Sequence, residues 1–319
     1  MAMSRGQFVR LLNKRLVQFQ ERFLRNGYVV GYPFHLVLET GNRCNLRCPL
    51  CPTPYRESRV PTGRLSLENA RRILDQFPYV NHVNLSLWGE PLLNKDIFDI
   101  IRCTRSRDIE VLVQSNLNIL SEETAERLVD SNLDILQISL DGASQESYEK
   151  YRVGGDFASV IRHINLIKDA QQRKGSHKPH IIWKMVVNRF NEHEIPIARN
   201  WARELGLEFK LVEIYTPSRV ADDWKPTRKI EESDEVHSDI VSRCYSLWQV
   251  AMVNFNGDVL PCCSEYSRLD AIGNVFEEPF HKIWNNRRYM DLRRHNRHRL
   301  NCEICHKDKD TNWYRSWMS

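Results

Sequence analysis

The sequence predicts an α/β fold, and two observations lead to this prediction. From residue 33 onward, apolar runs with strand character alternate with helical stretches in six repeated units. Repeated β–α units need right-handed crossovers, which build a parallel sheet. The second observation is that the repeated β–α units stop and short predicted strands follow after residue 240, which predicts a small C-terminal α+β domain. Six units make either an open sheet or an incomplete barrel, and in both the ligands gather at the carboxyl ends of the strands.

The elements of the main domain are expected in a regular order. Strands are predicted at 34–40, 82–88, 110–115, 134–140, 180–188 and 208–215. Helices follow the first five strands, at 66–77, 94–106, 121–131, 144–174 in two pieces, and 191–206. Ser66 and Ser121 stand where helix N-caps are expected, because acidic and amide residues follow each of them.

The N-terminal segment has its own pattern. Large apolar side chains recur at helical spacing between Arg and Lys residues over 7–25, at Phe8, Leu11, Leu12, Leu16, Phe19 and Phe23. We expect this amphipathic helix to pack against the main domain rather than lie on a membrane surface. The expected organisation is an N-terminal helix in 1–32, the α/β domain in 33–215, a polar linker in 216–240 and the C-terminal domain in 241–319.

Composition limits the class of protein. The 319 residues are 41% hydrophobic and 27% charged, as in a folded protein with a substantial core. No apolar run approaches the ~18 residues that a membrane span needs, and no signal peptide is evident, so a cytoplasmic location is expected. Part of the net charge of +5 comes from 285–300. We expect a solvated helix face there; the alternative is a site for an anionic substrate, and no nucleic-acid-binding module is evident.

Cysteine is the most informative residue type. Nine cysteines are many for a cytoplasmic chain, where disulfides rarely persist, so metal or redox chemistry is indicated. Cys44, Cys48 and Cys51 lie directly after the first predicted strand. Three thiolates on one tight loop can bind three irons of a [4Fe–4S] cluster and leave the fourth iron open for a ligand. Structural zinc would need a fourth ligand, and none is evident nearby.

Cys-x3-Cys-x2-Cys after the first strand of a β/α chain resembles the radical S-adenosylmethionine (SAM) superfamily. The sequence WGEP at 88–91 is similar to the GGEP loop of that family, with Trp88 in place of the first glycine. The resemblance covers about 34–215 and implies a partial (β/α)6 TIM-like barrel. It also implies that Gly89, Glu90 and Pro91 help to hold the SAM amino group.

The same resemblance implies further cofactor contacts. They are an apolar contact near the adenine and polar contacts at strand ends, from Leu50, Ser115, Asn116, Ser139, Asp141 and Asn188. In this family the cluster cleaves SAM reductively and leaves a 5′-deoxyadenosyl radical, which takes a hydrogen atom from the substrate. The resemblance therefore also implies a reducing partner such as flavodoxin or ferredoxin.

The C-terminal domain carries a second group of cysteines. Asn256-Gly257 between two apolar runs predicts a hairpin, and a helix is expected near 278–294. Four thiols, those of Cys244, Cys262, Cys302 and Cys305, can enclose either a zinc ion or an iron–sulfur cluster. The sequences NGDVLPCC and CEIC resemble the SPASM/twitch extension of some radical SAM enzymes, which implies one auxiliary [4Fe–4S] cluster.

Cys263 and Cys103 lie outside both ligand sets. Cys263 is either a packed thiol, an alternative ligand, or a catalytic hydrogen-atom donor of the kind found in radical SAM epimerases. Cys103 is expected in the core face of a helix.

The resemblance favours an enzyme that oxidises or epimerises a small polar substrate, such as a sugar or an aminocyclitol. Modification of a ribosomally made peptide is the alternative. A non-enzymatic iron–sulfur electron carrier is the third hypothesis, and the GEP sequence argues against it because a carrier needs no SAM site.

Overall fold

The structure is a computed structural model that describes residues 4–24, 26–55, 61–213, 223–227, 246–261 and 271–295. The chain divides into two compact units. The first comprises Met1–Arg43, Arg56–Leu112 and Val241–Cys302, and the second comprises Cys44–Tyr55, Val113–Ile240 and Glu303–Ser319. The division falls within strand β3.

The first unit is built around a mixed sheet with the strand order β3-β2-β1-β7-β8-β9. The strands are β1 (His35–Leu38), β2 (His82–Asn84), β3 (Glu110–Ser115), β7 (Val250–Val253), β8 (Asp258–Leu260) and β9 (Gly273–Asn274). β1 pairs in parallel with both β2 and β7, whereas β8 runs antiparallel to β7 and to β9. The hairpin predicted at Asn256-Gly257 is therefore confirmed as the β7–β8 turn, with Gly257 at φ +89°.

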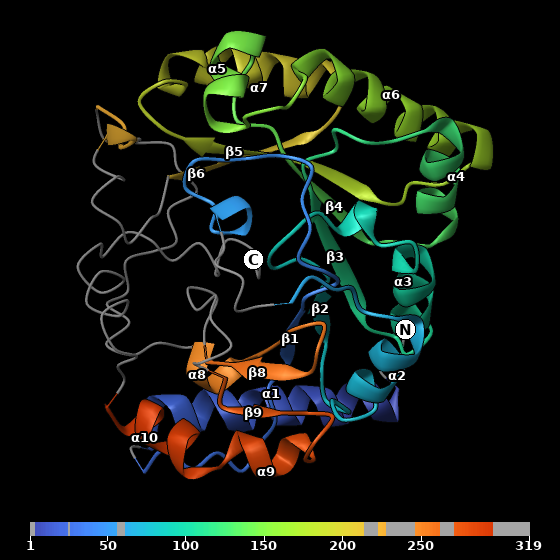
Figure 1. Ribbon diagram of the computed structural model, residues 1–319. Coiled ribbons are helices and arrows are strands. Elements are labelled where there is room, and N and C mark those ends of the chain that lie inside the picture. Colours follow the sequence, from blue (N-terminus) through green and yellow to red (C-terminus); the bar gives the residue numbers. More distant parts are fainter. Residues whose placement is uncertain are drawn as a thin grey trace. The chain divides into compact units, whose positions relative to one another are not determined.

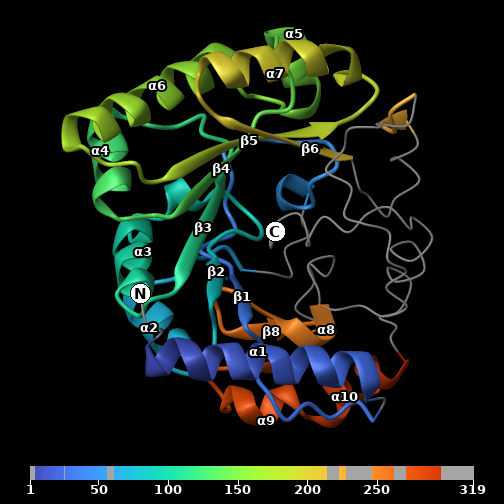
Figure 2. The same ribbon diagram turned by 180° about the vertical axis from the view of Figure 1, so that it is seen from behind.

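The helices of the first unit are α1 (Arg5–Phe23), α2 (Leu67–Leu74), α3 (Ile97–Arg105), α8 (Ser246–Gln249), α9 (Phe280–Trp284) and α10 (Arg287–His295), with the short 3-10 helix η2 (Pro91–Leu93). One helix was predicted near 278–294, and the structure has two. The break falls at Asn285, whose side-chain amide bonds both backbone groups of Val29. In Figures 1 and 2, α1, α9 and α10 lie at one end of this unit.

The second unit contains the strand order β6-β5-β4-β3. Its strands β4 (Ile135–Ser139), β5 (His180–Val187) and β6 (Glu208–Glu213) pair in parallel. Its helices are α4 (Glu122–Asp130), α5 (Gln145–Tyr151), α6 (Phe157–Lys174) and α7 (Ile195–Glu204), with the 3-10 helices η1 (Thr53–Tyr55) and η3 (Glu192–Glu194). Trp183 of β5 and Ile138 of β4 are fully buried in its core. In Figure 1, α6 and α7 lie on the outer side of β4 and β5.

The predicted β–α alternation is confirmed element by element. Within each unit, the parallel pairs bring the carboxyl ends of successive strands to one edge: β1–β2 and β2–β3 in the first unit, β4–β5 and β5–β6 in the second. Ser66 and Ser121 both cap helices, since each hydroxyl accepts a backbone N–H three residues on. β2 is shorter than predicted and ends at Asn84, because the side chain of Asn84 accepts the N–H of Ser86 and turns the backbone there. No helix of the described residues is long and apolar enough to cross a membrane.

Candidate active site

The cysteine loop begins a few residues after β1. Cys48 is buried, whereas Cys44 and Cys51 are half-buried. Hydrogen bonds within the loop define its course: the N–H of Cys51 donates to the carbonyl of Cys48 at 3.1 Å, and the N–H of Leu46 donates to Cys44 Sγ at 3.4 Å. The N–H of Arg47 also bonds the carbonyl of Val153, which ties the loop to the chain that follows α5.

Side-chain donors reach two of the three sulfurs. Asn116, at the end of β3, donates from Nδ2 to Cys44 Sγ at 3.7 Å and to Asn45 Oδ1 at 3.0 Å. Arg152 donates from Nη1 to Cys48 Sγ at 3.7 Å. Hydrogen bonds to cysteine sulfur stabilise negative charge on it and tune the potential of a bound iron–sulfur cluster. The donor set therefore suits cluster-binding thiolates.

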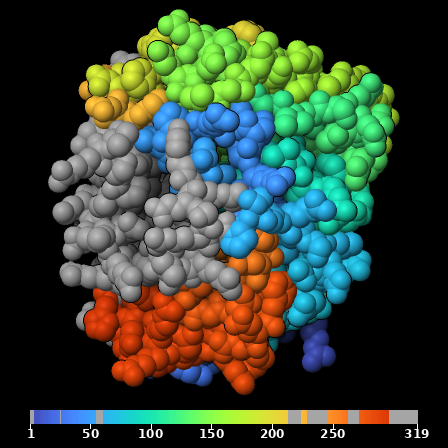
Figure 3. Space-filling view, in the orientation of Figure 1, coloured from blue at the N-terminus to red at the C-terminus, as the bar shows by residue number. Residues whose placement is uncertain are grey.

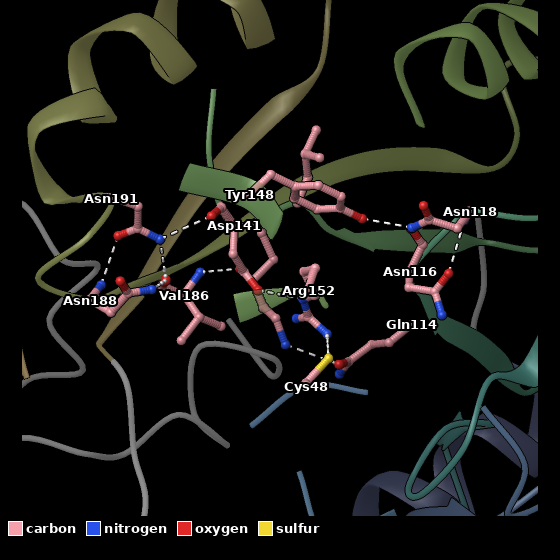
Figure 4. A network of polar contacts seen from close by, with 12 residues as sticks. Cys48, Gln114, Asn116, Asn118, Asp141, Tyr148, Arg152, Val186, Asn188 and Asn191 are labelled. Carbon is pink, nitrogen blue, oxygen red and sulfur yellow. Dashed lines mark hydrogen bonds and ion pairs between the residues drawn. The ribbon is translucent and has the colours of Figure 1, made fainter. Parts of the chain in front are cut away.

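Arg152 is held in place by a buried carboxylate. Its Nε donates to Asp141 Oδ2 at 2.6 Å, and the other oxygen of Asp141 accepts the N–H of Val186 at 2.6 Å. The Asp141 side chain is 0% exposed. Asn191 donates to the Asp141 backbone carbonyl at 3.1 Å, so residues after β4, on β5 and beside η3 meet here. Figure 4 shows Arg152 lying between Asp141 and Cys48.

Burial and charge shift the pKa values of this network. Burial raises the pKa of the Cys48 thiol, and the charge of Arg152 partly opposes that effect. Burial disfavours the cationic form of Arg152, but Asp141 and Cys48 outweigh burial, so the pKa of Arg152 is raised well above its ordinary value. Arg152 is thus a permanent cation beside a candidate cluster ligand.

A second buried cation lies on β5. Lys184 is 9% exposed, and its Nζ donates to Gln114 Oε1 at 3.0 Å. Burial lowers the pKa of Lys184 to about 8; the charge of Asp141 opposes the shift and that of Arg152 adds to it. Sequence reasoning singled out neither cation as a site residue. A lysine inside the apolar strand of 180–188 was the available signal, because lysine is almost never fully buried without a partner.

Some of the residues predicted to contact SAM belong to the first unit and the others to the second. Asn116, Asp141 and Asn188 belong to the polar network of the second unit, in which Asn188 bonds Asn191 through its N–H at 2.8 Å. Ser115 and Ser139 are buried at the ends of β3 and β4, and Leu50 is half-buried in the cysteine loop. Asp141 uses its two oxygens on Arg152 and Val186, a partnership that the sequence did not indicate.

The GEP residues lie in the first unit. Gly89 has φ +93°, and a Cβ there would lie 2.4 Å from the carbonyl oxygen of Gly41, so only glycine fits. The N–H of Glu90 donates at 2.7 Å to the carbonyl of Arg43, the residue directly before Cys44 in the chain. Glu90 Oε1 accepts the N–H of Leu92 and caps η2, and Pro91 begins that helix.

Of the cysteines outside the loop, the structure describes Cys103 and not those of the C-terminal domain. Cys244, Cys262, Cys263, Cys302 and Cys305 lie outside the described residues. Cys103 on α3 is half-buried rather than fully in the core. Within the part of the chain that the structure describes, no three Cys, His, Asp or Glu side chains gather as a metal-binding group. The assignment of thiols to clusters therefore stays a prediction.

Known proteins show the same fold. A curated relative, the tungsten-containing aldehyde ferredoxin oxidoreductase cofactor-modifying protein of Pyrococcus furiosus, is 24% identical over 299 residues, or 81% of this chain and 83% of the relative. SuiB of Streptococcus suis, solved with S-adenosylmethionine, superposes with a TM-score of 0.68 at 17% identity over 93% of this chain and 75% of SuiB. SuiB solved with the precursor peptide SuiA gives 0.66 at 16% identity over 97% of this chain and 76% of SuiB. BtrN in complex with AdoMet and 2-DOIA gives a TM-score of 0.56 at 16% identity, over 86% of this chain and 92% of BtrN.

Family profiles match both parts of the chain. The Radical SAM superfamily profile matches residues 38–195, which include the cysteine loop, the GEP residues and the Arg152 network. The iron-sulfur cluster-binding domain called SPASM matches residues 244–307, which include Cys244, Cys262, Cys263, Cys302 and Cys305. A [4Fe–4S] cluster, SPASM auxiliary iron–sulfur clusters and SAM are the cofactors of such a chain. The chain belongs to the radical SAM superfamily and carries a C-terminal SPASM iron–sulfur domain.

Proposed function

We propose that this radical SAM enzyme abstracts hydrogen from a small polar substrate, sugar-like or aminocyclitol-like, and oxidises or epimerises it. Membership of an enzyme superfamily sets aside the non-enzymatic electron carrier. When bound, the cluster and SAM supply the 5′-deoxyadenosyl radical. Cys44, Cys48 and Cys51 would hold that cluster. The observation that carries the proposal is the buried polar network around Cys48, in which Arg152 donates to the sulfur and Asp141 holds Arg152.

The roles of the chain's own residues follow from their contacts. Asn116 and Arg152 place N–H donors on two sulfurs, which would orient both thiolates and stabilise their charge. Asp141 orients Arg152, so we assign Asp141 a positioning role beside the SAM contact predicted for it. The Glu90 N–H bond to Arg43 constrains the backbone at the entrance to the cysteine loop.

Lys184 supports a polar substrate. With a pKa of about 8, it keeps a proton at neutral pH although it is buried, and its ammonium donates to Gln114 Oε1. Lys184 and Arg152 place two buried cations near the carboxylate of Asp141. A site lined by such polar groups suits a ligand with hydroxyl groups, and it disfavours an apolar one.

A second candidate function is modification of a ribosomally made peptide. The likeness to SuiB supports it, because SuiB was solved with a precursor peptide and superposes over 97% of this chain. The two candidate functions share the hydrogen abstraction step and differ in the substrate that loses the hydrogen. Reconstituted protein with SAM and dithionite would be given sugars and aminocyclitols deuterated at their ring carbons, or deuterated peptides. Deuterium in 5′-deoxyadenosine from a ring substrate supports the first candidate, and deuterium only from peptides contradicts it.

For the C-terminal domain we propose that Cys244, Cys262, Cys302 and Cys305 bind one auxiliary [4Fe–4S] cluster. Such a cluster would accept the electron of a substrate radical and so favour oxidation. Cys263 would instead donate a hydrogen atom in an epimerisation. Cys263→Ala with the cognate substrate separates the two: unchanged product supports oxidation, whereas lost product with continued 5′-deoxyadenosine release supports epimerisation.

A further inference from the structure

The helix α1 packs on its unit through the face that holds its buried residues Asn13, Val17 and Gln20. Its large apolar residues point to solvent, and the exposed fractions are 49% for Phe8, 52% for Leu12, 40% for Leu16, 56% for Phe19 and 59% for Phe23. Residues 8, 12, 16, 19 and 23 form one stripe along a helix. The expectation that α1 packs on the domain holds, but about half of each side chain in the apolar stripe stays exposed.

Hydrogen bonds hold α1 in this orientation. Asn13 exchanges two hydrogen bonds with the backbone of Tyr32, at 2.8 and 2.9 Å. Gln20 Oε1 accepts the N–H of Val30 at 3.0 Å and that of Gly31 at 3.3 Å. Arg10 donates to two backbone carbonyls just before β3, at 2.6 and 2.8 Å. Turning the stripe inward would break these bonds and leave polar groups buried without partners.

The exposed charged side chains of α1 itself are all arginines. Arg5, Arg15 and Arg22 are exposed on α1, and the guanidinium of Arg22 lies 5.5 Å from the centre of the Phe23 ring. Glu21 is the one acidic residue in Arg5–Phe23, and it bonds Gln249 on the packed side. Arg294 of α10, half exposed, donates to the carbonyl of Asn26 just beyond the end of α1 and also pairs with Asp291 at 3.3 Å.

These charges disfavour a second copy of the chain as the occupant. Leu12, Leu16, Phe19 and Phe23 have the alternate spacing of four and three residues found in a coiled-coil seam. The flanking positions on one side hold Arg15 and Arg22, and those on the other side hold the buried Asn13 and Gln20. Two copies would set arginine against arginine, with no carboxylate to pair with it. An anionic surface satisfies both the stripe and its cations.

We propose that α1 is an interfacial anchor that lies flat on an anionic lipid bilayer. The stripe enters the boundary between headgroups and acyl chains, and the flanking arginines bond lipid phosphates. The polar face meanwhile keeps its hydrogen bonds to the protein. Tyr28 and Val30, in the segment after the helix, are also 48% and 65% exposed. In Figure 2, α1 lies on the near side of its unit. Figure 3 shows the opposite face, on which α9 and α10 form the surface of this unit.

The test is vesicle flotation of the full-length reconstituted protein. Phosphatidylcholine vesicles are used with and without an equal share of phosphatidylglycerol. We expect binding to the anionic vesicles, weaker binding in high salt, and little binding to neutral vesicles. Phe19→Ser/Phe23→Ser should weaken binding at least about tenfold, because two half-exposed rings leave the bilayer. Arg15→Glu/Arg22→Glu should abolish the preference for anionic lipid.

The matched control is Ile119→Ser/Ile197→Ser, which removes two apolar side chains of similar exposure, 48% and 49%, from the second unit. This variant should bind like the wild type, and all variants should keep the wild-type unfolding midpoint. Equal binding to neutral and anionic vesicles, or no loss in the Phe19→Ser/Phe23→Ser variant, would overturn the proposal. A dimer in sedimentation that this variant dissociates would identify a second copy as the occupant and overturn it too.

Discussion

Arg152 and Asp141 form a buried ion pair, and Arg152 also donates a hydrogen bond to the sulfur of Cys48. The Nε–Oδ2 distance is 2.6 Å, and the side chains are 15% and 0% exposed. Arg152 reaches Cys48 across 104 residues of sequence. A cation enclosed in this way keeps its place only while the carboxylate is there, so the pair can be tested through stability as well as through activity.

We predict that Asp141→Asn lowers the free energy of unfolding by about 3 kcal/mol or more, because it leaves the Arg152 guanidinium buried without its countercharge. Urea unfolding measures this effect. The double variant Asp141→Asn/Arg152→Met should lose less than the sum of the two single variants, since it removes the Arg152 charge together with its countercharge. Strictly additive losses would show that the two residues are not coupled.

Gly89 provides a second test. A Cβ at Gly89 would meet the carbonyl oxygen of Gly41 at 2.4 Å and that of Arg43 at 2.7 Å, whereas nothing lies within 4 Å of a Cβ at Gly175. Both glycines have positive φ. Gly175→Ala should therefore cost only the backbone strain, about 1 kcal/mol, and leave SAM binding intact. Gly89→Ala should cost about 3 kcal/mol and weaken SAM binding. Similar unfolding energies for the two variants would refute the close packing at Gly89.

Lys184 makes stability depend on pH. Its pKa is about 8 in the folded protein and 10.5 unfolded, so between these values the unfolded state binds more protons and stability rises with pH. Below pH 8 the full penalty of burying the charge is present. The free energy of unfolding of the wild type minus that of Lys184→Met should thus increase by about 2–3 kcal/mol between pH 7.5 and 10.5. A difference that stays flat over this range would contradict a depressed pKa.

The auxiliary site predicts a change in metal content. Anaerobic reconstitution should give about eight irons per chain, and Cys302→Ala/Cys305→Ala should reduce them to about four. This variant should still cleave SAM but no longer turn over its substrate, because its altered residues belong to the SPASM region rather than to the cysteine loop. Iron and zinc are measured together on the same samples. One zinc with four irons in the wild type would make the C-terminal site a structural zinc site.

The alternation of strands and helices, the capping serines and the β7–β8 turn could be predicted because their signals are local. The Arg152–Cys48 contact could not, since it joins a helix end to a loop 104 residues earlier. Periodicity correctly located α1 but did not tell which face packs. The apolar stripe suggests the burial of Phe19, whereas the hydrogen bonds of Asn13 and Gln20 to residues 30–32 turn it outward.

The most direct test of the central claim is SAM cleavage by a variant without the cysteine loop's thiols. Wild-type protein and the triple variant Cys44→Ala/Cys48→Ala/Cys51→Ala are reconstituted anaerobically and incubated with SAM and dithionite, and Cys103→Ala is the matched cysteine control. We predict 5′-deoxyadenosine from the wild type and from Cys103→Ala, and none from the triple variant, which should keep about four irons. Continued 5′-deoxyadenosine formation by the triple variant would contradict the assignment of these cysteines.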